Sequence, residues 1–189
     1  MTDTVMTQTP AAAATTPADE ARRKIVLYTA TVGGVILLDQ VTKAIVLRQL
    51  RPYTPVEVGG DFFRLTFIYN TGAAFGLHLG EASRWVFMAL AAVAVVVLWF
   101  MFRGTPWRDK LRLVAIASVT GGAIGNVIDR VRSSRGVVDF LDFGVGEVRW
   151  PVFNVADIAV TVGALLLAFS LWREEQKIEQ ELDVAEPAD

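Results

Sequence analysis

Apolar residues are gathered along this 189-residue chain in four runs that are separated by polar segments. Each run has about the length that an α-helix needs to cross the apolar core of a bilayer. The pattern predicts an α-helical membrane protein with four transmembrane helices, at about residues 25–47, 85–102, 113–128 and 155–172. An even number of spans places both chain termini on the same side of the membrane.

The segments outside these runs differ from them in composition. Residues 1–22 are rich in Thr, Ala and Pro without an apolar period, which predicts a disordered N-terminal tail. Residues 174–189 are charged and mostly acidic, which predicts a solvated helix that frays into a C-terminal cytoplasmic tail. Residues 23–173 then form one four-helix membrane domain. Within it, apolar and polar residues alternate around a Gly-Gly-Asp turn at about 50–80, which predicts a small β-sheet outside the bilayer core.

Composition supports the membrane assignment and excludes several kinds of site. Hydrophobic residues make up 53% of the chain and the mean hydropathy is +0.42, which is too apolar for a typical soluble domain. The formal net charge of −2 provides no basic surface for nucleic acid. Cysteine is absent and His78 is the only histidine, so thiolate chemistry, a histidine-based triad and a multi-histidine metal site are excluded. We expect no metal and no cofactor.

Two of the predicted spans carry polar groups that membrane helices normally avoid. Asp39 and Lys43 lie four residues apart, on one face of the first helix, where they can neutralise each other. The pair is either a local ion pair at a helix end or a support for a functional loop. The third span is rich in small residues, which allow close helix contact, and it ends in Asn126, Asp129 and Arg130.

Basic residues indicate the orientation of the helices. The loop at 103–112 carries four of them, and the first span follows directly on Arg22, Arg23 and Lys24. The positive-inside rule then places both termini in the cytoplasm. We expect the protein to lie in the inner, cytoplasmic membrane of the cell. In that orientation polar groups from separate segments converge near the extracytoplasmic face, as in a functional site. They are Asp39 with Lys43, Asn70, Asn126 with Asp129 and Arg130, Asp139, and Asp157.

Two acids of the stretch 136–157, Asp139 and Asp157, lie within short apolar runs. A carboxylate beside hydrocarbon is costly to keep charged, so such residues are often functional. Two aspartates at close range share one proton, because both cannot ionise. One can then accept a proton from water while the other donates to the carbonyl oxygen of an amide. The residues alone do not bring the two acids together, so the acid pair is a hypothesis at this point.

Other functions stay open at this level. Ser133 and Ser134 lie in a basic loop without an evident base, which makes a serine–lysine peptidase a weak alternative. A small membrane transporter or channel would use the acids to bind protons or cations, but the second span carries no charge. A non-enzymatic scaffold would use the acids as structural hydrogen-bond partners.

Five motifs decide between these alternatives by resemblance. They are DQVTK at 39–43, NTGAAFG at 70–76, GGAIGNVIDR at 121–130, VVDF at 137–140 and FNVAD at 153–157. In this order and spacing they resemble the motifs of the lipoprotein signal peptidases, the type II signal peptidases of bacteria, which are aspartic proteases of the membrane.

The resemblance implies a function and a set of site residues. Asp139 and Asp157 would form the catalytic dyad of an intramembrane endopeptidase. It would remove the signal peptide of prolipoproteins by cleaving before the diacylglyceryl-modified cysteine. The supporting positions would be Asn70, Gly72, Asn126, Asp129, Arg130 and Asn154, with Asp39 and Lys43. The sheet would form an extracytoplasmic cradle over the substrate. We expect a monomer whose partners are lipid-modified prolipoproteins and membrane phospholipid. We place Asp139 on the loop after the third span, and we interpret Asp142, which lies outside the motifs, as a loop acid.

Overall fold

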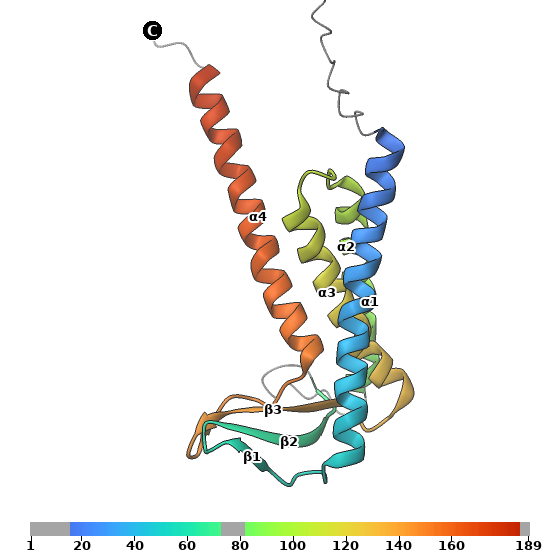
Figure 1. Ribbon diagram of the computed structural model, residues 1–189, viewed down its shortest axis with the longest axis vertical. Helices are drawn as coiled ribbons and strands as arrows, with labels where there is room; N and C mark the ends of the chain where they lie inside the picture. The colour runs from blue at the N-terminus through green and yellow to red at the C-terminus, as the bar shows by residue number, and fades with distance from the viewer. Residues whose placement is uncertain (1–15, 73–81, 186–189) are drawn as a thin grey trace, which may run out of the picture.

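The computed structural model describes residues 16–72 and 82–185, which form four α-helices and a four-stranded sheet (Figure 1). The helices are α1 (Pro17–Gln49), α2 (Ser83–Gly104), α3 (Lys110–Arg132) and α4 (Val155–Ala185). The strands are β1 (Val56–Gly59), β2 (Phe63–Asn70), β3 (Val137–Val145) and β4 (Val148–Arg149). All four of these helices are long and apolar enough to cross a membrane, so the predicted fold class is confirmed.

The start of α1 differs from the prediction. Residues 17–22, which we assigned to the tail, are helical. The Thr16 hydroxyl accepts a hydrogen bond from the Asp19 N–H at 3.2 Å, and the Asp19 carboxylate accepts one from the Thr16 N–H at 3.3 Å. This reciprocal cap, followed by Pro17, favours a helix start at this point. Predictions for residues 1–15, 73–81 and 186–189 lie outside the described residues; they concern most of the tail, part of the NTGAAFG motif and His78.

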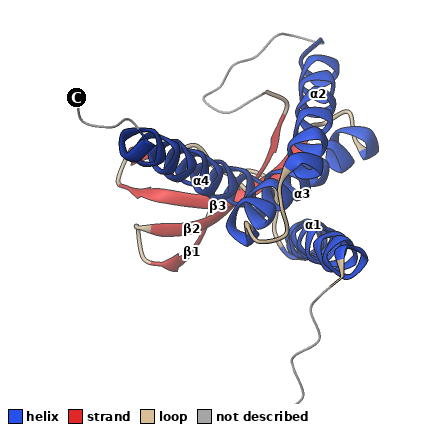
Figure 2. Ribbon diagram, turned by 90° about the horizontal axis from the view of Figure 1, so that it is seen from above, coloured by secondary structure: helices blue, strands red, loops and turns tan. Residues whose placement is uncertain are grey.

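Helix α3 packs against each of the other three helices and lies between them (Figure 2). Its small residues permit this. A Cβ atom added at Gly122 would lie only 2.4 Å from the carbonyl oxygen of Ala156 on α4, so a larger residue would push the two helices apart. The prediction of close helix contact along this face is confirmed.

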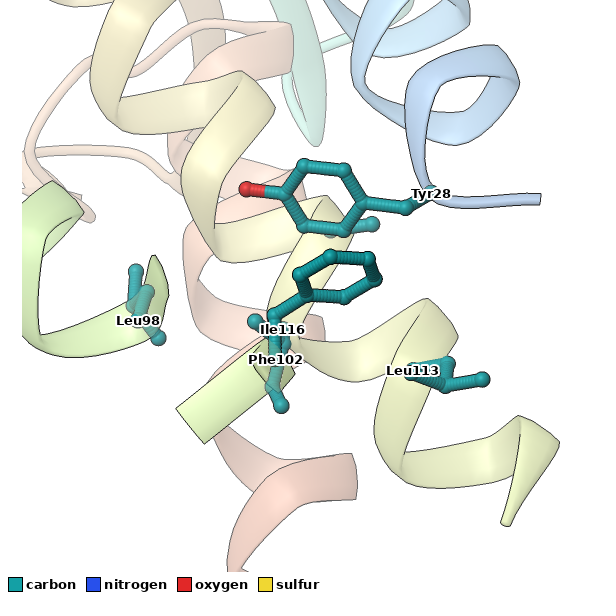
Figure 3. Packing of buried hydrophobic residues seen from close by; sticks show 6 residues of the cluster. Tyr28, Leu98, Phe102, Leu113 and Ile116 are labelled. Carbon is teal, nitrogen blue, oxygen red and sulfur yellow. The ribbon is translucent and has the colours of Figure 1, made fainter. Parts of the chain in front are cut away.

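Apolar side chains from α1, α2 and α3 fill the end of the bundle that is remote from the sheet. Tyr28, Leu98, Phe102, Leu113 and Ile116 pack together there (Figure 3). The Tyr28 and Phe102 ring centroids lie 4.2 Å apart. The cluster fixes the relative positions of three helices far from the polar residues identified above.

The outward faces of the helices are apolar as well. Leu37 on α1, Leu90 on α2 and Leu165 on α4 are each more than half exposed. Contiguous apolar surface of this kind is covered by lipid in a membrane protein, where the helical backbone satisfies its own hydrogen bonds. The protein is a multi-pass membrane protein.

The four strands form one antiparallel sheet in the order β1-β2-β3-β4. The β1–β2 hairpin lies in the segment where a sheet was predicted. Strand β3 was not predicted, and the assignment of Asp139 and Asp142 to a loop is wrong. The sequence of β3 is rich in valine and phenylalanine, which favour strands. Two helices, α2 and α3, separate β3 from its partner β2 in the sequence. No local turn signal could therefore indicate this pairing.

Asp142 is a structural acid of this sheet. It is 4% exposed, and its Oδ1 accepts a hydrogen bond from the Arg149 Nε at 2.6 Å. Its Oδ2 accepts one from the Thr66 hydroxyl at 2.5 Å. The carboxylate therefore joins β3 to both β2 and β4, and its hydrogen bonds are made within the sheet.

Candidate active site

The sheet lies at one end of the helix bundle, and the described chain ends lie at the other (Figure 1). Asp139 is on β3, and Asp157 is in the first turn of α4. Backbone hydrogen bonds join the segment before α4 to β3, since Phe140 N and Leu141 N both donate to the Phe153 carbonyl at 3.0 and 2.8 Å. The start of α4 is thereby held beside the strand that carries Asp139.

Asn154 connects the two acids. It is fully buried, and its Nδ2 donates to Asp139 Oδ1 at 2.6 Å, while its backbone N–H donates to Asp157 Oδ2 at 3.1 Å. In return, the Asp157 N–H donates to Asn154 Oδ1 at 2.9 Å. Asparagine at the N-cap and an acid three residues later are a favourable pair for starting a helix. The FNVAD motif is thus a helix cap whose acid belongs to the site.

Amide groups complete the surroundings of both carboxylates. Asp139 Oδ2 accepts a hydrogen bond from Asn70 Nδ2 at 2.9 Å, and Asp157 Oδ1 accepts one from Asn126 Nδ2 at 2.8 Å. Neither acid forms an ion pair within 4.0 Å among the described residues. Uncharged donors orient a carboxylate without neutralising it, so the pair keeps its ability to take up a proton.

The electrostatics of Asp139 follow from this environment. The side chain is 1% exposed, and burial together with the charge of Asp157 raises its pKa to about 7. The amides of Asn70 and Asn154 and the charge of Lys43 act in the opposite direction. An aspartate with this pKa is half protonated near neutral pH, which suits a residue that must both hold and release a proton.

Arg130 and Gly72 lie next to the acid pair. The Arg130 guanidinium donates to the Gly72 carbonyl at 3.1 Å and to the Asn126 carbonyl at 3.4 Å. The Gly72 N–H donates to Asn70 Oδ1 at 2.9 Å, which turns the Asn70 amide nitrogen toward Asp139. Arg130 therefore holds the loop that supplies one of the donors of Asp139.

A buried ion cluster of Lys43, Asp39 and Asp129 adjoins the acid pair. The Lys43 ammonium contacts Asp39 Oδ2 at 2.9 Å and Asp129 Oδ2 at 2.8 Å. It also donates to Asn126 Oδ1 at 3.1 Å, which connects the cluster to Asp157. With these contacts, all ten predicted site residues belong to one network of hydrogen bonds and ion pairs.

Two members of this network, Gln40 and Arg132, were not predicted from the sequence. Gln40 Nε2 donates to Asp39 Oδ2 at 3.0 Å and to Asp129 Oδ1 at 3.2 Å, and Arg132 donates to Gln40 Oε1 at 2.6 Å. An amide next to a buried acid in an apolar run was the available signal for Gln40. Among the described residues, no group of three or more His, Cys, Asp or Glu side chains could hold a metal ion.

Comparison with known proteins places this arrangement in a family. Residues 31–173 match the protein family described as signal peptidase (SPase) II. The lipoprotein signal peptidase of Symbiobacterium thermophilum is 44% identical over 142 residues, which cover 75% of this chain and 91% of the relative. The chain belongs to the signal peptidase II family. The lipoprotein signal peptidase of Burkholderia mallei is 45% identical over 137 residues, covering 71% of this chain and 81% of the relative.

A solved structure supports the same conclusion for the fold. A bacterial membrane enzyme aligns with a TM-score of 0.70 and 29% sequence identity, covering 82% of this chain and 91% of the other. Signal peptidase II is an aspartic peptidase of lipoprotein signal peptides, so the serine–lysine, transporter and scaffold alternatives are set aside. The resemblance inferred from the five motifs is confirmed.

Proposed function

We propose that Asp139 and Asp157 are the catalytic dyad of this signal peptidase, and that it cleaves prolipoproteins just before a diacylglyceryl-modified cysteine. The observation that carries the proposal is the bridge made by Asn154, which binds one oxygen of each acid. Two carboxylates held this way on uncharged donors, one buried and one half-buried, support a shared-proton pair.

The chemistry follows from the sharing of one proton. The charged carboxylate accepts a proton from a water molecule, and the water oxygen attacks the carbonyl carbon of the scissile amide. The protonated carboxyl group donates its proton to the carbonyl oxygen as the tetrahedral intermediate forms. When the C–N bond breaks, the carboxyl group that took the water proton gives it to the amine of the modified cysteine. A hydroxyl of the intermediate returns a proton to the other carboxylate, and the signal peptide leaves with a carboxyl group. The apolar surroundings strengthen the interactions that split the two pKa values of the pair.

The position of the site suits a substrate that is itself held in lipid. The sheet adjoins the ends of the helices, and four apolar side chains on its strands or directly beside them are each at least 60% exposed: Phe62, Val145, Val148 and Trp150. Aromatic and aliphatic side chains are favoured at the lipid–water boundary. A diacylglyceryl group can then stay among lipid tails while the adjoining peptide bond reaches the dyad.

The orientation of the molecule is a second part of the proposal. Basic residues near the chain ends favour cytoplasmic termini and a site near the extracytoplasmic face of the inner membrane. We propose that the protein acts as a monomer, since the described partners of the dyad all lie in one chain.

The orientation can be tested by labelling. The chain has no cysteine, so single cysteines introduced near Lys24 and near Val148 can be labelled from either side of the membrane. Labelling of the Val148 site from the cytoplasm would contradict this orientation.

The substrate class can be tested with one pair of precursors. Purified protein is given a diacylglyceryl-modified precursor and the same precursor with an unmodified cysteine. We expect release of the signal peptide from the first, with cleavage at the bond before the cysteine, and at least a hundredfold slower release from the second. Mass spectrometry of both products locates the cut. Equal rates for the two precursors would contradict the assigned substrate.

The pKa of Asp139 predicts a pH dependence. The shared proton leaves the pair as the pH rises through about 7, the pKa that burial and Asp157 confer on Asp139, so the acid catalyst is lost at higher pH. We expect kcat/KM to fall between pH 7 and pH 9, and to fall again at acid pH when both carboxyl groups are protonated. Initial rates from about pH 4 to pH 9 measure this, and a flat profile would speak against a shared proton.

A further inference from the structure

Lys43 is surrounded by three oxygen atoms in the interior of the protein. Its side chain is 3% exposed, and its Nζ lies 2.9 Å from Asp39 Oδ2, 2.8 Å from Asp129 Oδ2 and 3.1 Å from Asn126 Oδ1. An ammonium group has three N–H donors, so each donor has an acceptor. Lys43 forms no hydrogen bond and no ion pair with Asp139 or Asp157, so its contacts reach these two acids only through its three partners.

Each of the two acids around Lys43 binds the backbone directly before one residue of the dyad. Asp39 Oδ1 accepts a hydrogen bond from the N–H of Ala156, which precedes Asp157, at 3.0 Å. Asp129 Oδ2 accepts one from the N–H of Val138, which precedes Asp139, at 3.2 Å. One ammonium therefore joins two carboxylates that hold the chain beside the two catalytic positions, one on α4 and one on β3.

Lys43 also fixes the orientation of the side-chain amide of its third partner, Asn126. An ammonium group has no acceptor, so Asn126 must turn its oxygen toward Lys43. Its nitrogen then faces the other way, where it donates to Asp157 Oδ1 at 2.8 Å. The Asn154 amide nitrogen also donates to Asn126 Oδ1, at 3.1 Å, which fixes the same orientation. A flipped Asn126 would present an oxygen to the Asp157 carboxylate and repel it.

We propose that Lys43, with Asp39 and Asp129, is a positioning clamp that sets the separation of Asp139 and Asp157 and the orientation of the amide donor on Asp157. This inference rests on the proposed function, since it assigns Lys43 a task for that dyad. The clamp acts by position. The Lys43 Nζ holds Asp39, Asp129 and Asn126, and these three side chains in turn bind the Ala156 N–H, the Val138 N–H and the Asp157 carboxylate.

Gly125 and Gln40 lie next to Asp39 and help to accommodate the buried carboxylates of the clamp. A Cβ atom at Gly125 would lie 2.7 Å from Asp39 Oδ2, so only glycine leaves room for this carboxylate against α3. Gln40 Nε2 supplies further hydrogen bonds to both acids, at 3.0 and 3.2 Å. The buried carboxylates are thus satisfied by the Lys43 ammonium, an amide and backbone N–H groups, as buried charges require.

The alternative is that Lys43 is only a counterion for two buried acids. The two roles differ in what they require: a counterion needs only its positive charge, whereas a positioning residue also needs the geometry of its donors. Lys43→Arg keeps the positive charge, but a planar guanidinium cannot direct three donors from one atom. A counterion role predicts that Lys43→Arg keeps both thermal stability and kcat. A positioning role predicts that kcat for the lipid-modified precursor falls at least about tenfold at a temperature where the variant is folded, while KM stays within about threefold.

Lys43→Met combined with Asp129→Asn covers the case in which the arginine does not fit. This double variant removes one positive and one negative charge, so the net charge of the cluster is unchanged, and Asp39 keeps its hydrogen bonds from Gln40 and from the Ala156 N–H. We expect it to be folded, and its kcat to be reduced at least about tenfold with KM again little changed. The matched controls are Lys24→Arg and Lys24→Met, because Lys24 is on the same helix and donates to the Arg103 carbonyl at the opposite end of the bundle. Both should keep the wild-type kcat.

The folded fraction is measured by thermal unfolding in detergent, and kcat is expressed per folded molecule. Wild-type kcat in any folded Lys43 variant would overturn the clamp. A parallel assay of Asp139→Asn separates this failure from failure of the dyad. If Asp139→Asn is inactive while Lys43→Arg is fully active, the dyad stands and the clamp falls. If Asp139→Asn is active, the dyad itself is wrong.

Discussion

We expect replacement of Asp139 or Asp157 by asparagine to abolish cleavage of the lipid-modified precursor, with a loss of rate on the order of 10³-fold or more. An asparagine cannot take a proton from water or release one to the carbonyl oxygen. The remaining acid then has no partner with which to share its proton. Signal-peptide release from the purified protein in detergent or in vesicles measures the effect, alongside thermal unfolding to confirm that each variant is folded.

Asp142→Asn is the matched control for this experiment. Asp142 lies on the same strand and is buried to a similar degree, but it binds Arg149 and Thr66 within the sheet. We expect a lower thermal stability, because a buried ion pair loses one partner, and a cleavage rate within a few fold of wild type wherever the variant is folded. Near wild-type activity in Asp139→Asn or Asp157→Asn, or complete loss in folded Asp142→Asn, would refute the assignment.

The second large effect concerns Asn154. Asn154→Ala removes a cap of α4 and both side-chain hydrogen bonds of Asn154 to Asp139 and Asn126. Loss of a helix cap costs about 1 kcal/mol, and unpaired buried partners add to this. We expect a lower unfolding temperature and a kcat reduced about a hundredfold, since Asp139 loses the side-chain donor that ties it to the start of α4, where Asp157 lies.

Asn154→Ser distinguishes the two tasks of this residue. A serine hydroxyl can cap the helix by accepting from the Asp157 N–H, but it is too short to donate to Asp139. We expect the unfolding temperature to stay near that of the wild type while kcat remains strongly reduced. If serine restored both stability and kcat, Asn154 would be only a helix cap, and the bridge between the acids would have no catalytic part.

Hydropathy was sufficient to predict the four helices, because the bilayer imposes one length and one polarity on every span. The motifs supplied the candidate site residues. Neither could supply the connection from Asp39 to Ala156 or from Asp129 to Val138, since each joins a side chain to a backbone N–H whose identity leaves no trace in the sequence. Such contacts depend on the packing of α1 and α3 against the start of α4 and β3.

Strand β3 was missed for a related physical reason. Asp139 and Asp142 interrupt the apolar alternation that marks a strand, and both acids are tolerated only because β2, β4 and Asn154 supply hydrogen bonds. The start of α1 could have been predicted from the sequence. The pattern of Thr16, Pro17 and Asp19 is a local capping signal that the threonine-rich and proline-rich composition concealed.

The pairing of β2 with β3 also sets an order of assembly. When Phe63–Asn70 leaves the ribosome, its partner strand has not yet been synthesised, and two further helices must enter the membrane before Val137–Val145 can join it. Non-local pairings of this kind form late. Asp157 comes later still, with the first turn of the last helix. Until that helix is made, the chain holds only one of the two acids of the proposed dyad, so we expect cleavage to require the last helix.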